Sequence, residues 1–161
     1  MDITVRLTQL EDAPHLIEWL SDEKVLCWFP MSDAREIEDA ARIRVGYSKI
    51  GSGLTVLCEG EPCGLATLYI QPYKKLAHTC LFSIIVKKEL RGQGVGQLLL
   101  ERLIEMAKLK FHIEILHLEV YEGNPAQRLY EKMGFVEFGR QSHFIKEKGV
   151  FSAKILMQKK L

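Results

Sequence analysis

Apolar residues recur along this 161-residue chain with two periods, which predict a succession of strands and helices. Alternating or continuous apolar runs predict strands at residues 2–8, 54–58, 64–70, 78–86, 113–120, 135–145 and 150–158. Spacings of three and four predict helices at residues 8–20, with T-Q-L-E from Thr8 to Glu11 as a capping box, and at 34–49, 94–110 and 124–133. The run at 78–86 is apolar on both faces and is expected at the sheet centre. This order predicts the α/β class, with a mixed sheet covered by helices.

The segment NPAQRLYEKMGF, residues 124–135, has signals for both ends of a short helix. Asn124 suits the N-cap, Pro125 the first helical position, and Gly134 the left-handed position beyond the last turn. Its apolar residues, three or four apart, form one stripe: Ala126, Leu129, Tyr130 and Met133. A core role is therefore one interpretation of Tyr130.

The segment VKKELRGQGVG, residues 86–96, joins a predicted strand to a predicted helix through glycines. Glycine lets the backbone approach a ligand closely, and the first helical turn offers unpaired N–H groups and the positive end of the helix dipole. The junction therefore predicts an anion site that suits a pyrophosphate. Its glycine spacing is G-x-G-x-G, which is neither the dinucleotide fingerprint nor a P-loop, because Gln97 follows Gly96.

These two segments resemble motifs of one enzyme superfamily. Arg91, Gly94 and Gly96 form R-x-x-G-x-G, which resembles the acyl-CoA pyrophosphate loop of the GNAT superfamily of N-acetyltransferases. The element LYEKMGF resembles the family's L-Y-x-x-x-G-F, in which the tyrosine, here Tyr130, often points at the CoA sulfur. The motifs stand in the family order and the predicted elements follow the family topology. The resemblance therefore covers nearly the whole chain, expected to be a single domain over residues 1–161.

The resemblance implies a central, mostly antiparallel sheet with splayed fourth and fifth strands, and acetyl-CoA as cosubstrate without a metal. It implies that the acetyl group passes to a primary amine by direct attack. Pantetheine would pair with the splayed end of the fourth strand. The implied cofactor-binding residues are Ile84, Ile85, Val86, Arg91, Gly92, Gln93, Gly94, Val95, Gly96, Asn124 and Tyr130.

The catalytic candidates are Tyr130, Glu119 and His117. Tyr130 would meet the departing thiolate. An amine attacks only when deprotonated, so a base is needed. Glu119 stands in L-E-V, where some related enzymes carry their base, and His117 shares its strand face by alternation. Both are equally open to a solvated or ion-paired role, and His78 is a third candidate.

The sequence does not identify the acceptor of the acetyl group. Trp19, the run VLCWFP at residues 25–30 and the C-terminal segment resemble the branch of ribosomal-protein N-terminal and polyamine or aminosugar acetyltransferases, although the aromatic residues also suit a core. Two features depart from relatives: Ala153 stands where an acid is common, and Asn124 lies only two residues before Ala126. A small-molecule amine is expected first, a peptide N-terminus second, and a non-catalytic acyl-CoA-binding module third.

The amino-acid composition limits the classes of partner that the chain is expected to bind. With 22 Lys and Arg against 21 Asp and Glu, the chain lacks the basic field that nucleic-acid binding needs. The cations near the two motifs could serve a CoA phosphate or face solvent: Lys87, Lys88, Arg91, Arg128 and Lys132. The absence of a membrane-length apolar run or a signal peptide predicts a cytoplasmic protein, and a homodimer is possible.

The four cysteines are expected to be reduced and mostly buried. Cys58 and Cys63 flank a predicted hairpin turn and could lie near each other across it, but no second ligand pair for zinc accompanies them. Cys80 lies on the predicted fourth strand, where a nucleophilic role is conceivable.

Overall fold

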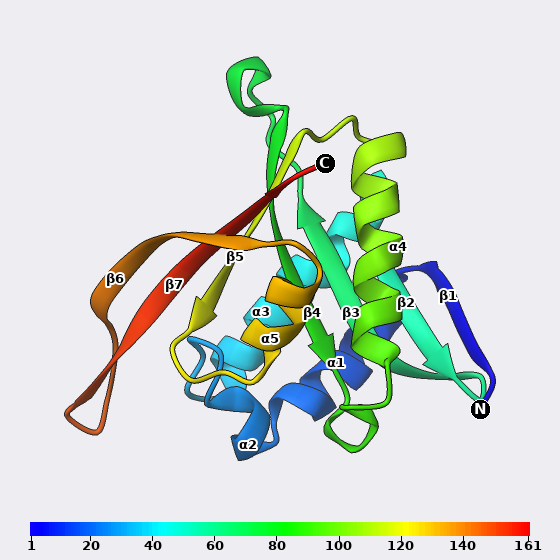
Figure 1. Ribbon diagram of the computed structural model, residues 1–161. Helices are drawn as coiled ribbons and strands as arrows, with labels where there is room; N and C mark the ends of the chain where they lie inside the picture. Colours follow the sequence, from blue (N-terminus) through cyan, green and yellow to red (C-terminus); the bar gives the residue numbers. More distant parts are fainter.

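The computed structural model describes residues 1–161 and contains one seven-stranded sheet with the order β1-β2-β3-β4-β5-β7-β6 (Figure 1). The strands are β1 (Ile3–Leu7), β2 (Gly53–Cys58), β3 (Glu61–Tyr69), β4 (Thr79–Val86), β5 (Ile115–Tyr121), β6 (Val136–Glu147) and β7 (Val150–Lys160). Only β4 and β5 are parallel neighbours; every other pair is antiparallel. The predicted α/β class with a mixed, mostly antiparallel sheet is confirmed, and β4 lies at its centre as expected.

The helices cover both faces of the sheet. They are α1 (Ala13–Leu20), α2 (Glu23–Leu26), α3 (Ala34–Gly46), α4 (Val95–Leu109) and α5 (Ala126–Lys132). One buried cluster joins α4 and Tyr130 of α5 to the strands, and a second joins α1, α2 and α3 to Leu65 and Ile85 on the opposite face. Strand residues alternate between these clusters, so neighbours in a strand contact different helical layers. None of the helices combines the length and hydrophobicity that crossing a membrane requires.

The sheet is split between β4 and β5. The two strands pair only at Thr79 with Ile115, Cys80 with Leu116, and Leu81 with His117. Beyond Leu81, β4 stays paired with β3, while β5 stays paired with β7. Figure 1 shows the two strands spreading apart, with α5 in the same region. The predicted splay of the fourth and fifth strands is therefore confirmed, and a wedge opens at the centre of the sheet.

The predicted capping box at Thr8 is displaced by one residue. Thr8 is buried, its amide donates to the Gly53 carbonyl (2.9 Å), and its hydroxyl is hydrogen-bonded to that of Thr55 (3.0 Å). The Asp12 carboxylate instead accepts from the Gln9 amide at 2.9 Å, and α1 begins only at Ala13. Thr8 cannot cap a helix because β2 already takes its polar groups.

The sequence predicted the caps of helix α5 but not the existence of helix α2. Asn124 caps α5 as expected, since its Oδ1 accepts from the Ala126 amide at 3.0 Å, and Gly134 has the predicted left-handed φ of 92°. The regular helix begins at Ala126, one residue later than predicted. Helix α2 was missed, although Asp22 caps it by accepting from the Lys24 amide at 2.9 Å. Its single turn is too short for periodicity to detect.

Asp12 is a buried carboxylate that ties β1, β2 and α1 together. It accepts hydrogen bonds from the Arg6 guanidinium (2.8 and 2.9 Å), the Gln9 amide (2.9 Å) and the Thr55 hydroxyl (2.8 Å). Burial by itself raises the pKa of Asp12, but these hydrogen bonds outweigh it and hold the pKa below its ordinary value. A lowered pKa stabilises the fold above the unfolded value of about 3.9, and this contribution is lost as pH falls through the folded pKa.

We expect Asp12→Asn to lower the free energy of unfolding by roughly 2 kcal/mol at pH 7, because the Arg6 charge loses its partner. The difference should shrink at pH 3, because the carboxyl of the unfolded wild type, with a pKa of about 3.9, is then mostly protonated. Urea unfolding at both pH values measures this. Asp39→Asn is the matched control, since Asp39 forms only an exposed ion pair with Arg42 and should change stability by less than about 0.5 kcal/mol. Equal effects of the two variants would contradict the proposed role of Asp12.

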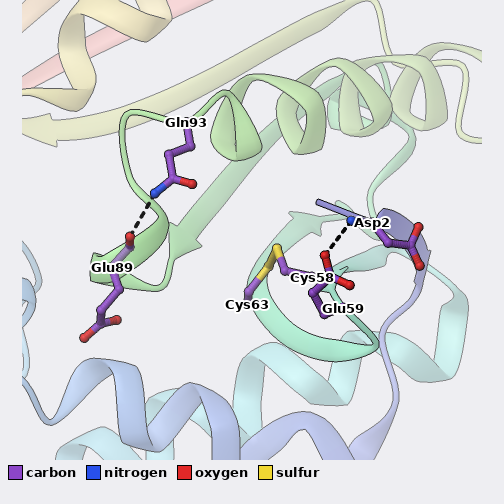
Figure 2. Close-up of a disulfide and its surroundings, with 6 residues drawn as sticks. All are labelled: Asp2, Cys58, Glu59, Cys63, Glu89 and Gln93. Carbon is purple, nitrogen blue, oxygen red and sulfur yellow. Dashed lines mark hydrogen bonds between the residues drawn. A yellow bond between two sulfur atoms is a disulfide. The ribbon is translucent and has the colours of Figure 1, made fainter.

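Cys58 and Cys63 form a disulfide across the β2–β3 turn, so the expectation of reduced thiols is wrong for this pair (Figure 2). Glu59 and Gly60 adopt left-handed φ values of 52° and 82°, which produces a tight hairpin. The turn brings the two cysteine Cα atoms to 6.0 Å, within the usual disulfide range. Cys27 and Cys80 are free, the first exposed and the second buried.

Candidate active site

A cavity of about 950 Å³ opens where β4 and β5 separate. Phe82 and Val120 line it and belong to the core cluster beneath α4. Ser83 and Glu119 also line it and alternate with them along the strands, so they lie on the α1–α3 face. The cavity therefore extends through the sheet. Its two ends are formed by different layers of helices, which suits a site that holds two reactants.

At the α4 end, a run of backbone amides is free to bind an anion. The first intrahelical bond of α4 runs from the Leu98 amide to the Gly94 carbonyl at 3.0 Å. None of the six amides from Gly92 to Gln97 donates a hydrogen bond within the protein. Gly92, Gly94 and Gly96 line the cavity, and the first two have left-handed φ values of 74° and 83°. Left-handed glycines followed by a helix N-terminus provide the geometry that phosphate oxygens require.

The other predicted loop residues fall into two groups. Arg91 lines the cavity, and its Nε donates to the Val86 carbonyl at 3.2 Å. The Gln93 side chain donates instead to the Glu89 carbonyl at 3.1 Å (Figure 2), and the Val95 side chain is buried in the core. Only the backbone amides of Gln93 and Val95 can therefore serve a ligand.

Two of the five cations near the motifs line the cavity, namely Arg91 and Lys132. Lys132 donates to the Gln97 side chain at 2.9 Å, at the first turn of α4. Lys88 lies 3.6 Å from the Asp22 carboxylate instead, and Lys87 and Arg128 lie outside the cavity walls. The positive charge near the anion loop is therefore smaller than the sequence suggested.

The residues predicted to contact the pantetheine arm all line the cavity: Ile84, Ile85 and Val86 of β4. They lie beyond Leu81, where β4 has lost β5 as a neighbour. One edge of β4 is therefore open to an extended ligand, which can pair with backbone groups as a strand would. Asn124 also lines the cavity, but its side-chain oxygen is engaged in capping α5.

Tyr130 is a core residue that also lines the cavity. Its ring packs in the core against Phe82 and Phe135, with ring centroids 6.1 and 6.2 Å away, and the residue is only 8% exposed. It also lines the cavity, and its hydroxyl takes part in none of the side-chain hydrogen bonds of the protein. Burial raises the pKa of Tyr130 to about 12, partly opposed by the nearby Arg91 charge. The phenol is therefore a protonated donor with nothing else to bind.

The three candidate bases differ in their position relative to the cavity. Glu119 lines the cavity, and its carboxylate lies 3.4 Å from the Lys154 ammonium, which itself sits over the Phe144 ring at 3.9 Å. His117 does not line the cavity; it is paired with Leu81 at the last ladder position between β5 and β4. Burial lowers the pKa of His117, with the Glu119 charge opposing this shift. His78 is exposed and outside the cavity.

Cys80 is not positioned to act as a nucleophile. Its side chain belongs to the core cluster and does not line the cavity. Burial also raises the pKa of its thiol to about 12, so the reactive thiolate is scarce at neutral pH.

The opposite end of the cavity contains residues that the sequence did not assign to a site. Trp28, Phe29 and Pro30 precede α3 and line this end, whereas Trp19 is a core residue. The clustering of aromatic residues in this segment was the only sequence feature that could have indicated a site here. Arg44 of α3, Tyr69 of β3 and Ser83 of β4 complete this wall. Nothing in the helical pattern distinguishes Arg44 from the exposed arginines of α3, so sequence reasoning missed it.

Comparison with known proteins identifies the family of the fold. Residues 13–135 match the model of the acetyltransferase (GNAT) family. A [ribosomal protein bS18]-alanine N-acetyltransferase of Haemophilus influenzae is 41% identical over 75 residues, which are 46% of this chain and 51% of that protein. The L-amino acid N-acetyltransferase AaaT of Escherichia coli is 29% identical over 83 residues, which are 51% of each chain. The chain thus spans about half the length of the curated relatives it matches.

The fold likeness extends further than these alignments. A crystal structure of a ribosomal-protein-alanine N-acetyltransferase from Brucella melitensis superposes with a TM-score of 0.84 at 26% identity. The superposition covers 98% of this chain and 99% of the other. Both splayed strands and the loop before α4 lie within residues 13–135, which the family model matches.

Proposed function

Since the chain belongs to the GNAT acetyltransferase family, we propose that it transfers the acetyl group of acetyl-CoA to a primary amine. The observation that carries this proposal is the joint presence, in one cavity, of six unpartnered amides, an open edge of β4 and the unpaired hydroxyl of Tyr130. A non-catalytic acyl-CoA-binding module would need the first two features but not the third.

In this proposal the CoA pyrophosphate accepts hydrogen bonds from the amides between Gly92 and Gln97, close to the Arg91 and Lys132 side chains. The pantetheine arm lies along Ile84, Ile85 and Val86, and the thioester reaches the wedge between β4 and β5. This arrangement leaves the α1–α3 end of the cavity for the acceptor. Holding both reactants in one cavity supplies part of the acceleration by orientation.

The reaction proceeds by direct attack of the neutral amine on the thioester carbonyl. A backbone N–H of β4 stabilises the developing oxyanion, and the Tyr130 hydroxyl donates a hydrogen bond to the departing sulfur. The attacking amine must lose a proton, and Glu119 is the carboxylate that lines the same cavity. We therefore assign the base to Glu119, through a water molecule, rather than to His117.

The proposed acceptor is a small molecule, with a peptide N-terminus as the alternative. A polyamine is disfavoured because Glu119 is the only acid that lines the cavity, while the acids of α3 at 36, 38 and 39 lie outside it. The names of the Haemophilus and Brucella relatives favour the peptide alternative. We place the reaction in the cytoplasm, where acetyl-CoA is available.

Acetyl-CoA should stabilise the protein by about 2.7 kcal/mol at 100 times its dissociation constant. NAD and ATP at the same concentration should raise the melting temperature much less, because they lack the pantetheine arm that β4 accommodates. Differential scanning fluorimetry measures the shifts, and release of free CoA thiol with a panel of amines, aminosugars and peptides then tests turnover. Equal stabilisation by NAD would refute the assignment of the loop, and acetyl-CoA binding without turnover on any amine would favour the non-catalytic module.

A further inference from the structure

Tyr121, the last residue of β5, brings a second tyrosine into the cavity. It stands two positions after Glu119, so alternation along the strand puts both side chains on the α1–α3 face. Tyr130, by contrast, belongs to the core cluster beneath α4. Tyr121 therefore lies at the end of the cavity that is proposed to receive the acceptor.

The hydroxyl of Tyr121 is unpartnered and open to a ligand, although the residue as a whole is only 7% exposed. It takes part in none of the side-chain hydrogen bonds of the protein. The only fully buried side-chain atoms without a partner are Arg44 Nη1 and Thr67 Oγ1, so the unpartnered Tyr121 oxygen keeps surface that a ligand can reach. Because Tyr121 lines the cavity, a molecule bound there can contact this oxygen.

Neighbouring side chains hold Tyr121 and Glu119 in place. The Tyr121 ring packs against Phe144, with ring centroids 6.2 Å apart. Lys154 pairs with Tyr121 in the β5–β7 ladder and places its ammonium 3.9 Å from the centre of the Phe144 ring. The same ammonium lies 3.4 Å from the Glu119 carboxylate. The phenol and the carboxylate are therefore held together on one face of β5.

An amine that attacks a thioester has two N–H groups to place. The lone pair of a neutral primary amine must point at the carbonyl carbon, which directs both N–H bonds away from it. One of these protons leaves toward Glu119 as the N–C bond forms and the C–S bond breaks. The other stays on nitrogen as the N–H of the product amide. It needs an acceptor within the cavity, since an unpaired polar group removed from water is costly.

We infer that the Tyr121 oxygen accepts this second N–H, so that Tyr121 and Glu119 together select a primary amine over an N-methylated one. The inference rests on the proposed acetyl transfer and adds a residue that touches its acceptor. An N-methyl amine has a single N–H, and its methyl group would face the Tyr121 oxygen in place of a donor.

The phenol suits this role because it stays neutral. Burial, and to a lesser degree the nearby Glu119 charge, raises the pKa of Tyr121 to about 12. A neutral phenol oxygen can accept the amine N–H while its own O–H remains available to water. The proton that leaves the amine therefore goes to Glu119, and Tyr121 only holds the nitrogen in position.

The test compares benzylamine, glucosamine and trialanine with derivatives that carry one methyl group on the same nitrogen. Initial rates of CoA thiol release give kcat and KM for wild type, Tyr121→Phe and the control Tyr73→Phe. Tyr121→Phe keeps the ring that packs against Phe144, and Tyr73→Phe deletes a hydroxyl from an exposed residue outside the cavity. The thermal shift with acetyl-CoA shows that each variant is folded and binds the cofactor.

We expect wild type to favour at least one primary amine over its N-methyl form by about tenfold or more in kcat/KM. Tyr121→Phe should lower kcat/KM for that primary amine by about tenfold and change it by less than about threefold for the N-methyl amine. The preference should therefore fall toward one, whereas Tyr73→Phe should leave it unchanged. A purely structural role of Tyr121 would slow both members of a pair alike.

Equal kcat/KM for the two members of every pair in wild type would overturn the inference while upholding acetyl transfer. An unchanged preference in Tyr121→Phe would overturn it as well. Stabilisation by acetyl-CoA without turnover of any of these amines would overturn both the inference and the proposed transfer.

Discussion

Tyr130→Phe is expected to lower turnover on the acceptor by about 100-fold or more, with little change in acetyl-CoA affinity or melting temperature. The substitution keeps the ring that packs against Phe82 and Phe135 and removes only the hydroxyl, which forms no side-chain hydrogen bond in the protein. Removing a donor used only as charge develops on sulfur should affect kcat and kcat/KM alike.

The raised pKa of Tyr130 defines what this hydroxyl can do. With the phenol near pKa 12 and a thiol near about 8.5, full proton transfer to the thiolate is uphill by roughly 5 kcal/mol. In the proposed reaction the hydroxyl therefore serves as a hydrogen-bond donor to the departing sulfur, and the final proton comes from solvent.

Steady-state kinetics with saturating acetyl-CoA measures the effect of Tyr130→Phe. Tyr73→Phe is the matched control, because it deletes the same atom from a residue that is 70% exposed and outside the cavity. Turnover of Tyr130→Phe within about threefold of wild type would show that Tyr130 is a core residue only.

Gly94→Asp is expected to weaken acetyl-CoA binding by about 100-fold relative to Gly94→Asn. Gly94 has a φ of 83°, a conformation that Asn and Asp tolerate better than other non-glycine residues, and an added Cβ would meet nothing within 4 Å. The two variants share shape and backbone strain, so their difference isolates one negative charge beside the proposed pyrophosphate. At about 5 Å and an effective dielectric constant near 20, that repulsion is roughly 3 kcal/mol.

Isothermal titration calorimetry gives the two dissociation constants. The same pair of substitutions at Gly60 is the control, because Gly60 has a φ of 82° with open space around it but lies in the β2–β3 turn, away from the cavity. The difference at Gly94 should shrink with added salt, since mobile ions screen the repulsion. Similar affinities of Gly94→Asp and Gly94→Asn would mean that no phosphate lies beside this loop.

The sequence predicted the lining of the cavity near α4 and α5 far better than the lining near α3. The glycines before α4 and Tyr130 of α5 stand in local motifs whose spacing alone indicates their geometry, and the cavity includes them. Arg44, by contrast, is held in the cavity wall by Tyr69 and Phe29, which approach it only in the folded chain. No local pattern could reveal these long-range contacts.

Other differences between the sequence predictions and the structure have similar causes. Alternation put His117 on the face of Glu119, but it could not show which residues of this face line the cavity, and His117 does not. Thr8 has a capping residue's chemistry, but its pairing with Thr55 outweighs that local preference. The Cys58–Cys63 bond depends on a turn whose conformation brings the two residues together.

The split between β4 and β5 also has a mechanical consequence. Three residue pairs are the only ladder between the four-stranded half, β1 to β4, and the three-stranded half, β5 to β7. Each half has its own continuous ladder, so the seam between them is the place where the sheet can flex with the least loss of hydrogen bonds. A pantetheine arm bound in this seam would act as a missing strand, and cofactor binding would stiffen the molecule along its central line.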